Sequence, residues 1–107
     1  MAVSIDEFKK LALKVATIKA VKEHPSADRL YILTISTGSE DKDIVAGIKL
    51  HYSKEELIGR QVIVADNLEP AVIRGVESKG MVLAVKDGNA LSLIVPDKPV
   101  TPGCPVS

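Results

Sequence analysis

The first apolar positions of the chain predict a short helix followed by a long, bent strand. Ser4–Glu7 has the form of a capping box, and apolar residues then recur at helical spacing. We therefore expect a helix over about residues 4–11 that lays one apolar face on the strand after it. Alternating apolar residues come next, and their register changes near Ala16 and Thr17. One strand with a β-bulge at that point explains the change, and bulges allow a sheet to curve into a barrel.

The remaining pattern predicts further strands, with a second helix between the third and fourth. Ser53–Glu56 is another capping box, and the helix it begins should end at Gly59. Runs rich in apolar and β-branched residues predict strands over about 30–37, 43–49, 60–66, 80–86 and 91–95. An order of three strands, one helix and further strands is that of the OB fold. The predicted fold class is therefore all-β with short helices, a five-stranded OB-fold barrel with an N-terminal helix, a helix between strands 3 and 4, and a C-terminal extension.

Size and composition indicate one domain with an aliphatic core. A chain of 107 residues forms a single domain, 1–107, and only three of its residues are aromatic, so Val, Ile and Leu must fill the barrel. The tail from Pro96 to Ser107 holds four prolines, which excludes a central strand. We expect this tail to lie over the barrel or over a neighbouring subunit. Residues of about 90–107 form the predicted dimerisation extension.

Two unusual segments stand out against this frame, at residues 24–31 and 67–81. In an OB fold the loop between strands 1 and 2 and the loop between strands 4 and 5 flank the face that binds nucleic acids. The topology therefore predicts that both segments meet on that face. The second segment is longer than a strand connection needs and is rich in hydrogen-bond donors and glycine. The alternative is an ordinary Ω-loop packed by its own apolar residues.

Four ordered blocks of residues resemble the tRNA-binding domain family. They read KVATI from Lys14, HPSADRLY from His24, VAGI from Val45, and NLEPAVIRGVESKGM from Asn67. The resemblance covers about residues 4–106. It implies binding of the outer corner of folded tRNA, and it carries functional positions onto Arg29, Ser78 and Met81. The chain departs from the family at Ala12, Lys14 and Lys79, where members often have other residues.

The residues expected to contact tRNA are Arg29, Asn67, Arg74, Ser78, Lys79 and Met81. The charged members would attract phosphates, and an arginine fork can hold one bidentately. The serine and the asparagine would hydrogen-bond phosphate, ribose or a base edge. The methionine would pack on a base or ribose, although a position facing the core is an equal alternative. Few aromatic residues favour folded RNA over single strands, whose binders depend on stacking platforms.

Charge and composition bear on three further questions, namely the binding face, catalysis or metal binding, and localisation. Basic and acidic residues number 14 each, but residues 9–29 hold six basic and only two acidic side chains. The alternative to a basic binding face is a solvated, salt-bridged surface. One cysteine, Cys104, and the histidines His24 and His51 make no zinc or catalytic signature, so we expect no catalytic residues, metal or cofactor. His24 is more typical of a hydrogen-bonding loop residue. The lone cysteine, the short apolar runs and the lack of a signal-like start indicate a cytoplasmic protein without membrane contact.

The predicted function is structure-specific, largely sequence-independent tRNA binding by a homodimer. Such a protein would serve an aminoacyl-tRNA synthetase, most naturally methionyl-tRNA synthetase, as a β subunit or appended domain. We expect the dimer interface at Leu91–Val95 and the tail, with a synthetase catalytic subunit as a further partner. Two alternatives remain from the sequence. One is a protein-binding chaperone of the related secretion-chaperone branch, and the other is a pure oligomerisation module.

Overall fold

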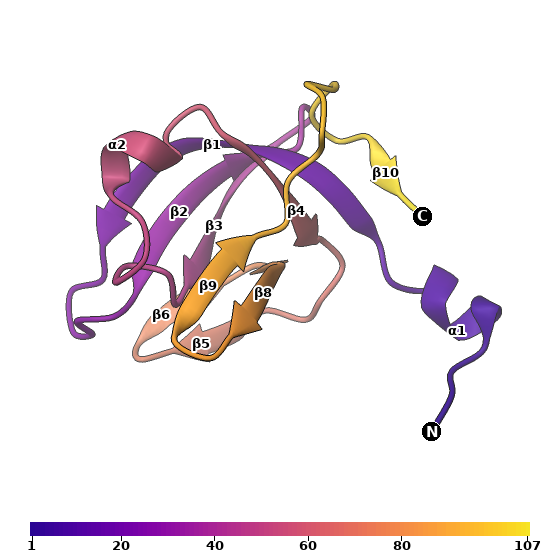
Figure 1. Ribbon diagram of the computed structural model, residues 1–107, viewed down its shortest axis with the longest axis horizontal. Helices are drawn as coiled ribbons and strands as arrows, with labels where there is room; N and C mark the ends of the chain where they lie inside the picture. The colour runs from indigo at the N-terminus through magenta and orange to yellow at the C-terminus, as the bar shows by residue number, and fades with distance from the viewer.

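The barrel is organised around one long strand that both halves of the sheet share. The computed structural model describes all of residues 1–107. β1 (Leu13–Glu23) pairs antiparallel with β2 (Tyr31–Ser36) through its second half and with β4 (Gln61–Ala65) through its first half (Figure 1). β3 (Asp41–Ala46) pairs with β2, and β7 (Met81–Val82) pairs with β4. The resulting order, β3-β2-β1-β4-β7, forms a nearly closed five-stranded antiparallel barrel and confirms the predicted OB-fold class.

The bulge in β1 lies slightly later than the sequence pattern predicted. The register with β2 shifts between Ile18 and Ala20, rather than near Ala16 and Thr17. The side chains of Ala16 and Ile18 are fully buried in the barrel. Val15 is buried as well, but the C-terminal segment runs alongside it, and its backbone N–H donates to the Cys104 carbonyl at 3.0 Å. The tail therefore runs directly beside Val15, which lies outside the core cluster.

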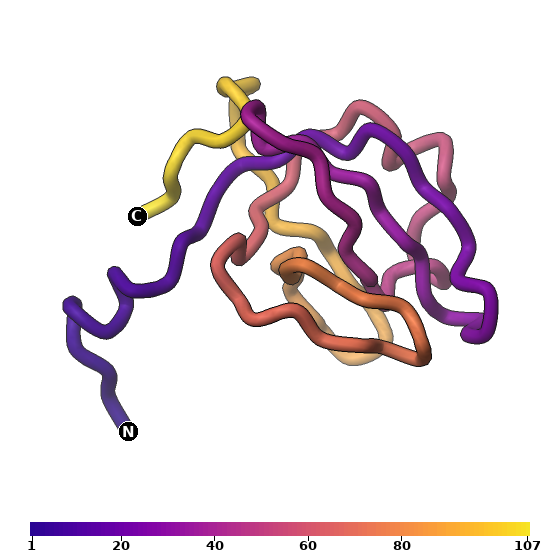
Figure 2. Tube along the Cα trace, turned by 180° about the vertical axis from the view of Figure 1, so that it is seen from behind, coloured from indigo at the N-terminus to yellow at the C-terminus, as the bar shows by residue number.

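The N-terminal helix α1 (Ile5–Lys9) has the predicted capping box but does not pack on the barrel. The Ser4 hydroxyl accepts from the backbone N–H of Glu7, and the Glu7 carboxylate accepts from the N–H of Ser4. No residue of the helix is buried, and Ile5 and Phe8 are 68% and 43% exposed. Figures 1 and 2 show the helix projecting away from the barrel. The expectation of an apolar face laid on the adjoining strand is therefore wrong, because the helix extends beyond every barrel element.

The second helix, α2 (Lys54–Leu57), closes one end of the barrel. Its N-cap is Ser53, whose hydroxyl accepts from the N–H of Glu56, as the second capping box predicted. Leu57 is fully buried in the core. Neither α1 nor α2 has the length and apolar character that a membrane-spanning helix needs.

The strand predicted over residues 80–86 is divided between two sheets. β7 stays with the barrel, whereas β8 (Ala84–Asp87) forms a hairpin with β9 (Ala90–Leu93). Leu83 lies between β7 and β8. Its backbone N–H donates to the Ile63 carbonyl at 2.9 Å, and its carbonyl accepts from the Ile94 N–H at 3.1 Å. The chain ends in β10 (Pro105–Val106), which pairs with the start of β1. The tail therefore lies over the barrel, which is one of the two positions expected for it.

The core is aliphatic, as the composition predicted. The two tyrosines at its margin both use their hydroxyls, since Tyr31 donates to the Tyr52 carbonyl at 2.9 Å and Tyr52 accepts from the N–H of Leu93 at 3.0 Å. The largest fully buried side chains are those of Ile18, Leu33, Ile35, Ile44, Leu57, Val62 and Val64.

A small hairpin crosses the open side of the barrel between β3 and β7. β5 (Ala71–Ile73) and β6 (Val76–Ser78) pair only with each other, and Figure 2 shows this hairpin as a separate ribbon beside the main strands. The backbone N–H of Lys79 donates to the Asp43 carbonyl of β3 at 3.0 Å. Part of the long segment 67–81 is therefore an ordered hairpin that bridges the gap in the barrel.

Candidate nucleic-acid interface

The two unusual segments of the sequence meet directly in the structure. The His24 Nε2 lies 3.0 Å from the Ile73 carbonyl oxygen, and the Ser26 hydroxyl donates to the Arg74 carbonyl at 3.0 Å. The Arg74 guanidinium in turn donates to the Ser26 carbonyl at 3.4 Å. Each of these contacts joins residues 48 or 49 positions apart in the chain. We call residues 24–30 and the β5–β6 hairpin, residues 71–78, the two-loop rim.

Local sequence explains the shape of each half of the rim. Arg74 and Gly75 have φ values of 52° and 89°, which make them the two central residues of a tight hairpin turn. Arg74 is the only non-glycine residue of the chain with a positive φ. In the first loop Pro25 restricts the backbone, and the Ser26 N–H donates to the His24 Nδ1 at 3.1 Å. Both loops therefore reach the rim in fixed conformations.

Arg29 and Arg74 line one hollow on the rim, together with Ser26, Asp28 and Leu30. Neither arginine takes part in an ion pair. Ion pairs instead engage six of the 14 basic residues, namely Lys14, Lys19, Lys42, Lys49, Lys54 and Lys79. Two arginines from distant parts of the chain thus line one hollow together with Asp28, and neither of them forms an ion pair. That arrangement suits phosphate oxygens, which an arginine fork can bind bidentately.

Glu23, the carboxylate just before the rim, forms ion pairs with two lysines. Glu23 lies 2.6 Å from the Lys49 Nζ and 3.6 Å from the Lys54 Nζ. Hydrogen bonding and charge attraction from Lys49, with a further contribution from Lys54, lower the pKa of Glu23. The same hydrogen bond raises the pKa of Lys49. Glu23 therefore does not cancel the positive charge of the two arginines.

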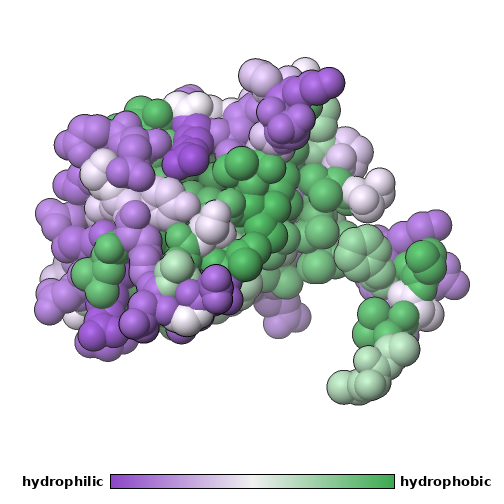
Figure 3. Space-filling model, in the orientation of Figure 1, coloured by the Kyte–Doolittle hydropathy of each residue, from purple (hydrophilic) through white to green (hydrophobic).

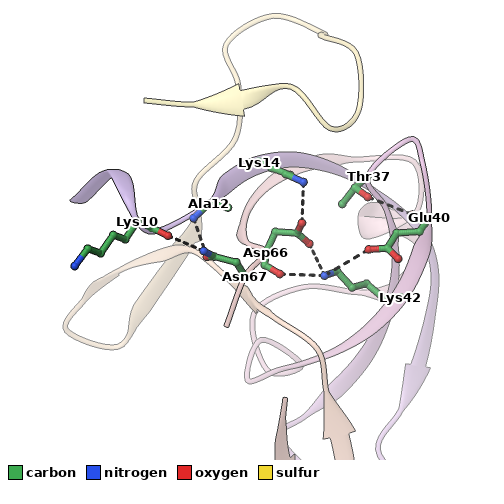
Figure 4. Close-up of polar contacts among 8 residues, drawn as sticks. All are labelled: Lys10, Ala12, Lys14, Thr37, Glu40, Lys42, Asp66 and Asn67. Carbon is green, nitrogen blue, oxygen red and sulfur yellow. Dashed lines mark hydrogen bonds and ion pairs between the residues drawn. The ribbon is translucent and has the colours of Figure 1, made fainter. Parts of the chain in front are cut away.

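The side chains of Ser78, which is buried, and Asn67, which is exposed, bond to backbone groups of the protein. Ser78 is 3% exposed, and its hydroxyl accepts from the Val45 N–H at 2.9 Å and donates to the Gly80 carbonyl at 3.0 Å. The Asn67 amide accepts from the Ala12 N–H at 2.7 Å and donates to the Lys10 carbonyl at 2.6 Å (Figure 4). Both residues hold the long segment in place. A direct contact of either residue with RNA stays a prediction.

The remaining two predicted contacts lie on the surface, apart from the arginine hollow. The Lys79 Nζ is 3.8 Å from the Glu77 carboxylate and borders a second hollow, which also contains Asp41 and Asp43. Met81 is 55% exposed on β7, so it does not face the core. The structure therefore brings Arg29 and Arg74 together and leaves Lys79 and Met81 as separate surface positions.

An ion cluster supports the start of the long segment. The Asp66 carboxylate lies 3.0 Å from the Lys14 Nζ and 2.5 Å from the Lys42 Nζ, and its side chain is 10% exposed (Figure 4). Burial alone would raise the pKa of Asp66, but the hydrogen bonds and charges of Lys42 and Lys14 outweigh burial and lower it. The Lys42 Nζ also donates to the backbone carbonyl of Asp66 at 3.1 Å. This cluster ties together β1, β3 and the end of β4.

The barrel and its rim define a small binding domain of the OB-fold class. A family model described as "Putative tRNA binding domain" matches residues 13–105. The chain belongs to this tRNA-binding domain family. No group of three or more His, Cys, Asp or Glu side chains is placed to hold a metal ion.

Several methionine–tRNA ligases contain a region similar to this chain. The ligase of Thermococcus kodakarensis is 50% identical over 101 residues, which cover 94% of the chain and 14% of that ligase. The Thermotoga maritima ligase is 43% identical over 106 residues, covering 99% of the chain and 17% of that ligase. The chain thus spans less than a fifth of these curated relatives.

Solved structures of similar chains have the same fold. A methionyl-tRNA synthetase related protein from Pyrococcus horikoshii aligns with a TM-score of 0.92 and 31% identity, over 100% of this chain and 99% of that one. The chaperone CsaA from Bacillus anthracis aligns with a TM-score of 0.89 and 27% identity, over the full length of both chains. The C-terminal domain of Plasmodium vivax p43 has 34% identity and a TM-score of 0.87, over 94% of this chain and 62% of that one.

Proposed function

We propose that the chain binds folded tRNA through the two-loop rim, recognising structure rather than sequence and performing no chemistry of its own. One observation carries this proposal, namely the unpaired Arg29 and Arg74 that two distant loops hold on a single hollow. Membership of the tRNA-binding domain family supports tRNA as the ligand. Backbone phosphates are the same in every tRNA, so binding through them would not depend on sequence.

The aromatic residues favour folded RNA over single strands as the ligand. Tyr31 is 5% exposed, and its hydroxyl is bonded within the protein. Tyr52 lies beneath the Arg60 guanidinium, 5.6 Å from ring centre to guanidinium carbon, and Phe8 is on α1. The rim therefore offers no platform on which unpaired bases could stack, and recognition would use backbone and shape.

In this proposal the chain is a trans-acting subunit or appended domain of methionyl-tRNA synthetase, working in the cytoplasm. Similarity to a region of several methionine–tRNA ligases supports this assignment. The domain would hold tRNA near the catalytic subunit and raise its local concentration, since linked binding sites act at a high effective concentration.

We propose further that the protein is a homodimer whose interface includes α1 as well as the tail. Phe8 and Leu11 line an apolar hollow with Leu13, Pro105 and Val106, so both ends of the chain form one surface. Ile94 and Val95, just after β9, are 38% and 42% exposed. Figure 3 shows apolar side chains gathered over this face and again on α1. A second copy would cover the apolar surface that an isolated subunit exposes.

Titration of full-length tRNA at several salt concentrations tests the tRNA-binding proposal. Arg29→Ala and Arg74→Ala should each weaken binding roughly tenfold or more, because each removes hydrogen bonds to a charged group. Each should also reduce the slope of log K against log salt by about 0.7–0.9. Full tRNA should bind more tightly than an isolated acceptor minihelix.

Lys86→Ala is the matched control for this titration. Lys86 is an exposed cation on β8 that forms no ion pair, and it lies outside both the two-loop rim and the proposed dimer interface. Its removal should leave affinity and slope unchanged. If both arginine variants bind tRNA as wild type does, the site is misplaced, and a pure oligomerisation role would account for the protein.

A protein-binding chaperone is the second candidate, and the similarity to two CsaA chaperone structures favours it. Their TM-scores are 0.89 and 0.91, with 27% and 29% identity. Such a protein would bind extended peptides with little salt dependence. Tight peptide binding together with weak, salt-insensitive tRNA binding would favour the chaperone over the tRNA binder.

A further inference from the structure

His24 is the only ionisable residue of the rim that is buried. It is 6% exposed, and both of its ring nitrogens face hydrogen-bonding groups. Nδ1 lies 3.1 Å from the Ser26 N–H and must accept, whereas Nε2 lies 3.0 Å from the Ile73 carbonyl and must donate. One neutral tautomer satisfies both contacts. The ring thus joins its own loop to the hairpin, and it is too buried to meet RNA itself.

The hairpin depends on such links for its position. β5 and β6 have three residues each and pair with no other strand. A two-stranded hairpin of this size is at best marginally stable alone. Ser78 and Lys79 fasten its base to β3. Its tip, which carries Arg74, is fastened to the first loop through His24 and Ser26.

We propose that His24 is a positioning residue of the tRNA site, the main part of a clasp that fixes Arg74 beside Arg29 for binding RNA phosphates. This inference rests on the proposed tRNA-binding function. Ser26 is the second part of the clasp, because its hydroxyl donates to the Arg74 carbonyl. The guanidinium donates only one long bond, of 3.4 Å, to the Ser26 carbonyl, so most of its five N–H groups remain free for phosphate.

A fixed tip lowers the entropy that binding must remove from the hairpin. With the clasp open, the Arg74 side chain would sample many positions, and fewer of them would lie within reach of a phosphate that Arg29 already holds. Loss of the clasp should therefore appear as loss of the Arg74 contact. It should leave the contribution of Arg29 in place.

Two substitutions of His24 separate its two hydrogen bonds. The amide nitrogen of glutamine stands at the same number of bonds from Cβ as Nε2, so His24→Gln can still donate to the Ile73 carbonyl. The amide oxygen of asparagine corresponds to Nδ1, so His24→Asn keeps the bond from the Ser26 N–H and loses the link between the loops. We expect His24→Gln to bind tRNA within about threefold of wild type, and His24→Asn to bind about tenfold more weakly, as expected for one lost hydrogen bond.

A double-mutant cycle with Arg74→Ala distinguishes positioning from a general structural role. If the clasp acts through Arg74, adding His24→Asn to Arg74→Ala should weaken tRNA binding by less than about twofold further, because coupled residues are not additive. His24→Asn alone should also reduce the salt slope towards that of Arg74→Ala. His51→Asn is the matched control, since His51 is exposed and its side chain makes no hydrogen bond.

Additive effects of the two substitutions, or wild-type binding by His24→Asn, would overturn the clasp. If Arg29→Ala and Arg74→Ala still weaken binding in that case, the tRNA site stands and only the clasp fails. If neither arginine variant weakens binding, the proposed site itself fails. Should His24→Asn not fold, Ser26→Ala offers the same cycle. It should weaken binding severalfold in the wild-type background and leave binding unchanged in Arg74→Ala, and additivity there would overturn the clasp equally.

Discussion

Replacing Ser78 with alanine tests whether this residue holds the barrel together or contacts RNA. Where β3 faces the hairpin, the Ser78 hydroxyl makes hydrogen bonds that a neighbouring strand would otherwise make. It accepts from the Val45 N–H and donates to the Gly80 carbonyl. Val45 is itself only 7% exposed. In Ser78→Ala both backbone groups lose their partner, and water has little access to the buried Val45 N–H.

The loss of these contacts sets the expected loss of stability. Leaving one buried donor unsatisfied costs about 1–3 kcal/mol. In a domain of this size each kcal/mol lowers the Tm by about 4–8 °C, so the Tm should fall by roughly 4–24 °C. The Val45 amide should also exchange its hydrogen faster, because the opening of this part of β3 no longer breaks a hydrogen bond.

Thermal unfolding and amide exchange of Ser78→Ala, beside tRNA titration well below the Tm, complete the assay. Ser92→Ala is the matched control, because Ser92 is exposed on β9 and its side chain makes no hydrogen bond. We expect the Tm of the control to match that of wild type. A Ser78→Ala protein with wild-type Tm and Val45 exchange, but with weakened tRNA binding, would refute the structural role and favour direct contact.

Three further predictions concern the ion cluster, the tail and the dimer. Lys42 and Lys14 lower the pKa of Asp66 below its ordinary value of 3.8. The ion cluster therefore contributes its full stabilisation at pH values above 3.8. This stabilisation should disappear as the pH falls through the lowered pKa, and urea unfolding at stepped pH should show a smaller acid-induced loss in Asp66→Asn. Gly103 has a φ of 92°, and a Cβ there would overlap the Thr37 carbonyl. Gly103→Ala should therefore lower the Tm by more than Gly88→Ala, whose Cβ would meet open space, and equal Tm values would contradict the observed path of the tail. Phe8→Ser should shift a dimer towards monomer in analytical ultracentrifugation, and an unchanged mass at low concentration would exclude α1 from the interface.

The sequence predicted the barrel well because its elements depend on local patterns. Ser4 and Ser53 cap both helices as expected, although only Ser4 forms the complete capping box. Local patterns could not predict that the distant Cys104 segment lies beside the buried Val15. The exposed face of α1 was missed for the related reason that apolar spacing shows which side of a helix is apolar and not what covers it.

The site was predicted in outline, and its chemistry only in part. Fold topology was sufficient to place the two loops together, and the contacts of His24 and Ser26 with the hairpin confirm that placement. Which polar side chains remain free could not be predicted. A serine and an asparagine look the same in the sequence whether or not their side chains are free to bind a ligand. Only the folded structure shows that backbone N–H groups already bond to Ser78 and Asn67. The His-Pro-Ser run was the one local signal for the clasp.

NMR titration of the labelled protein with full-length tRNA tests the central claim most directly, because it reports every backbone amide at once. If two remote loops form one binding surface, the largest changes should fall together on residues 24–30 and 71–78, and Arg29 and Arg74 should respond at the same tRNA concentration. Changes confined to the β8–β9 hairpin and the tail, with both loops unaffected, would contradict the account.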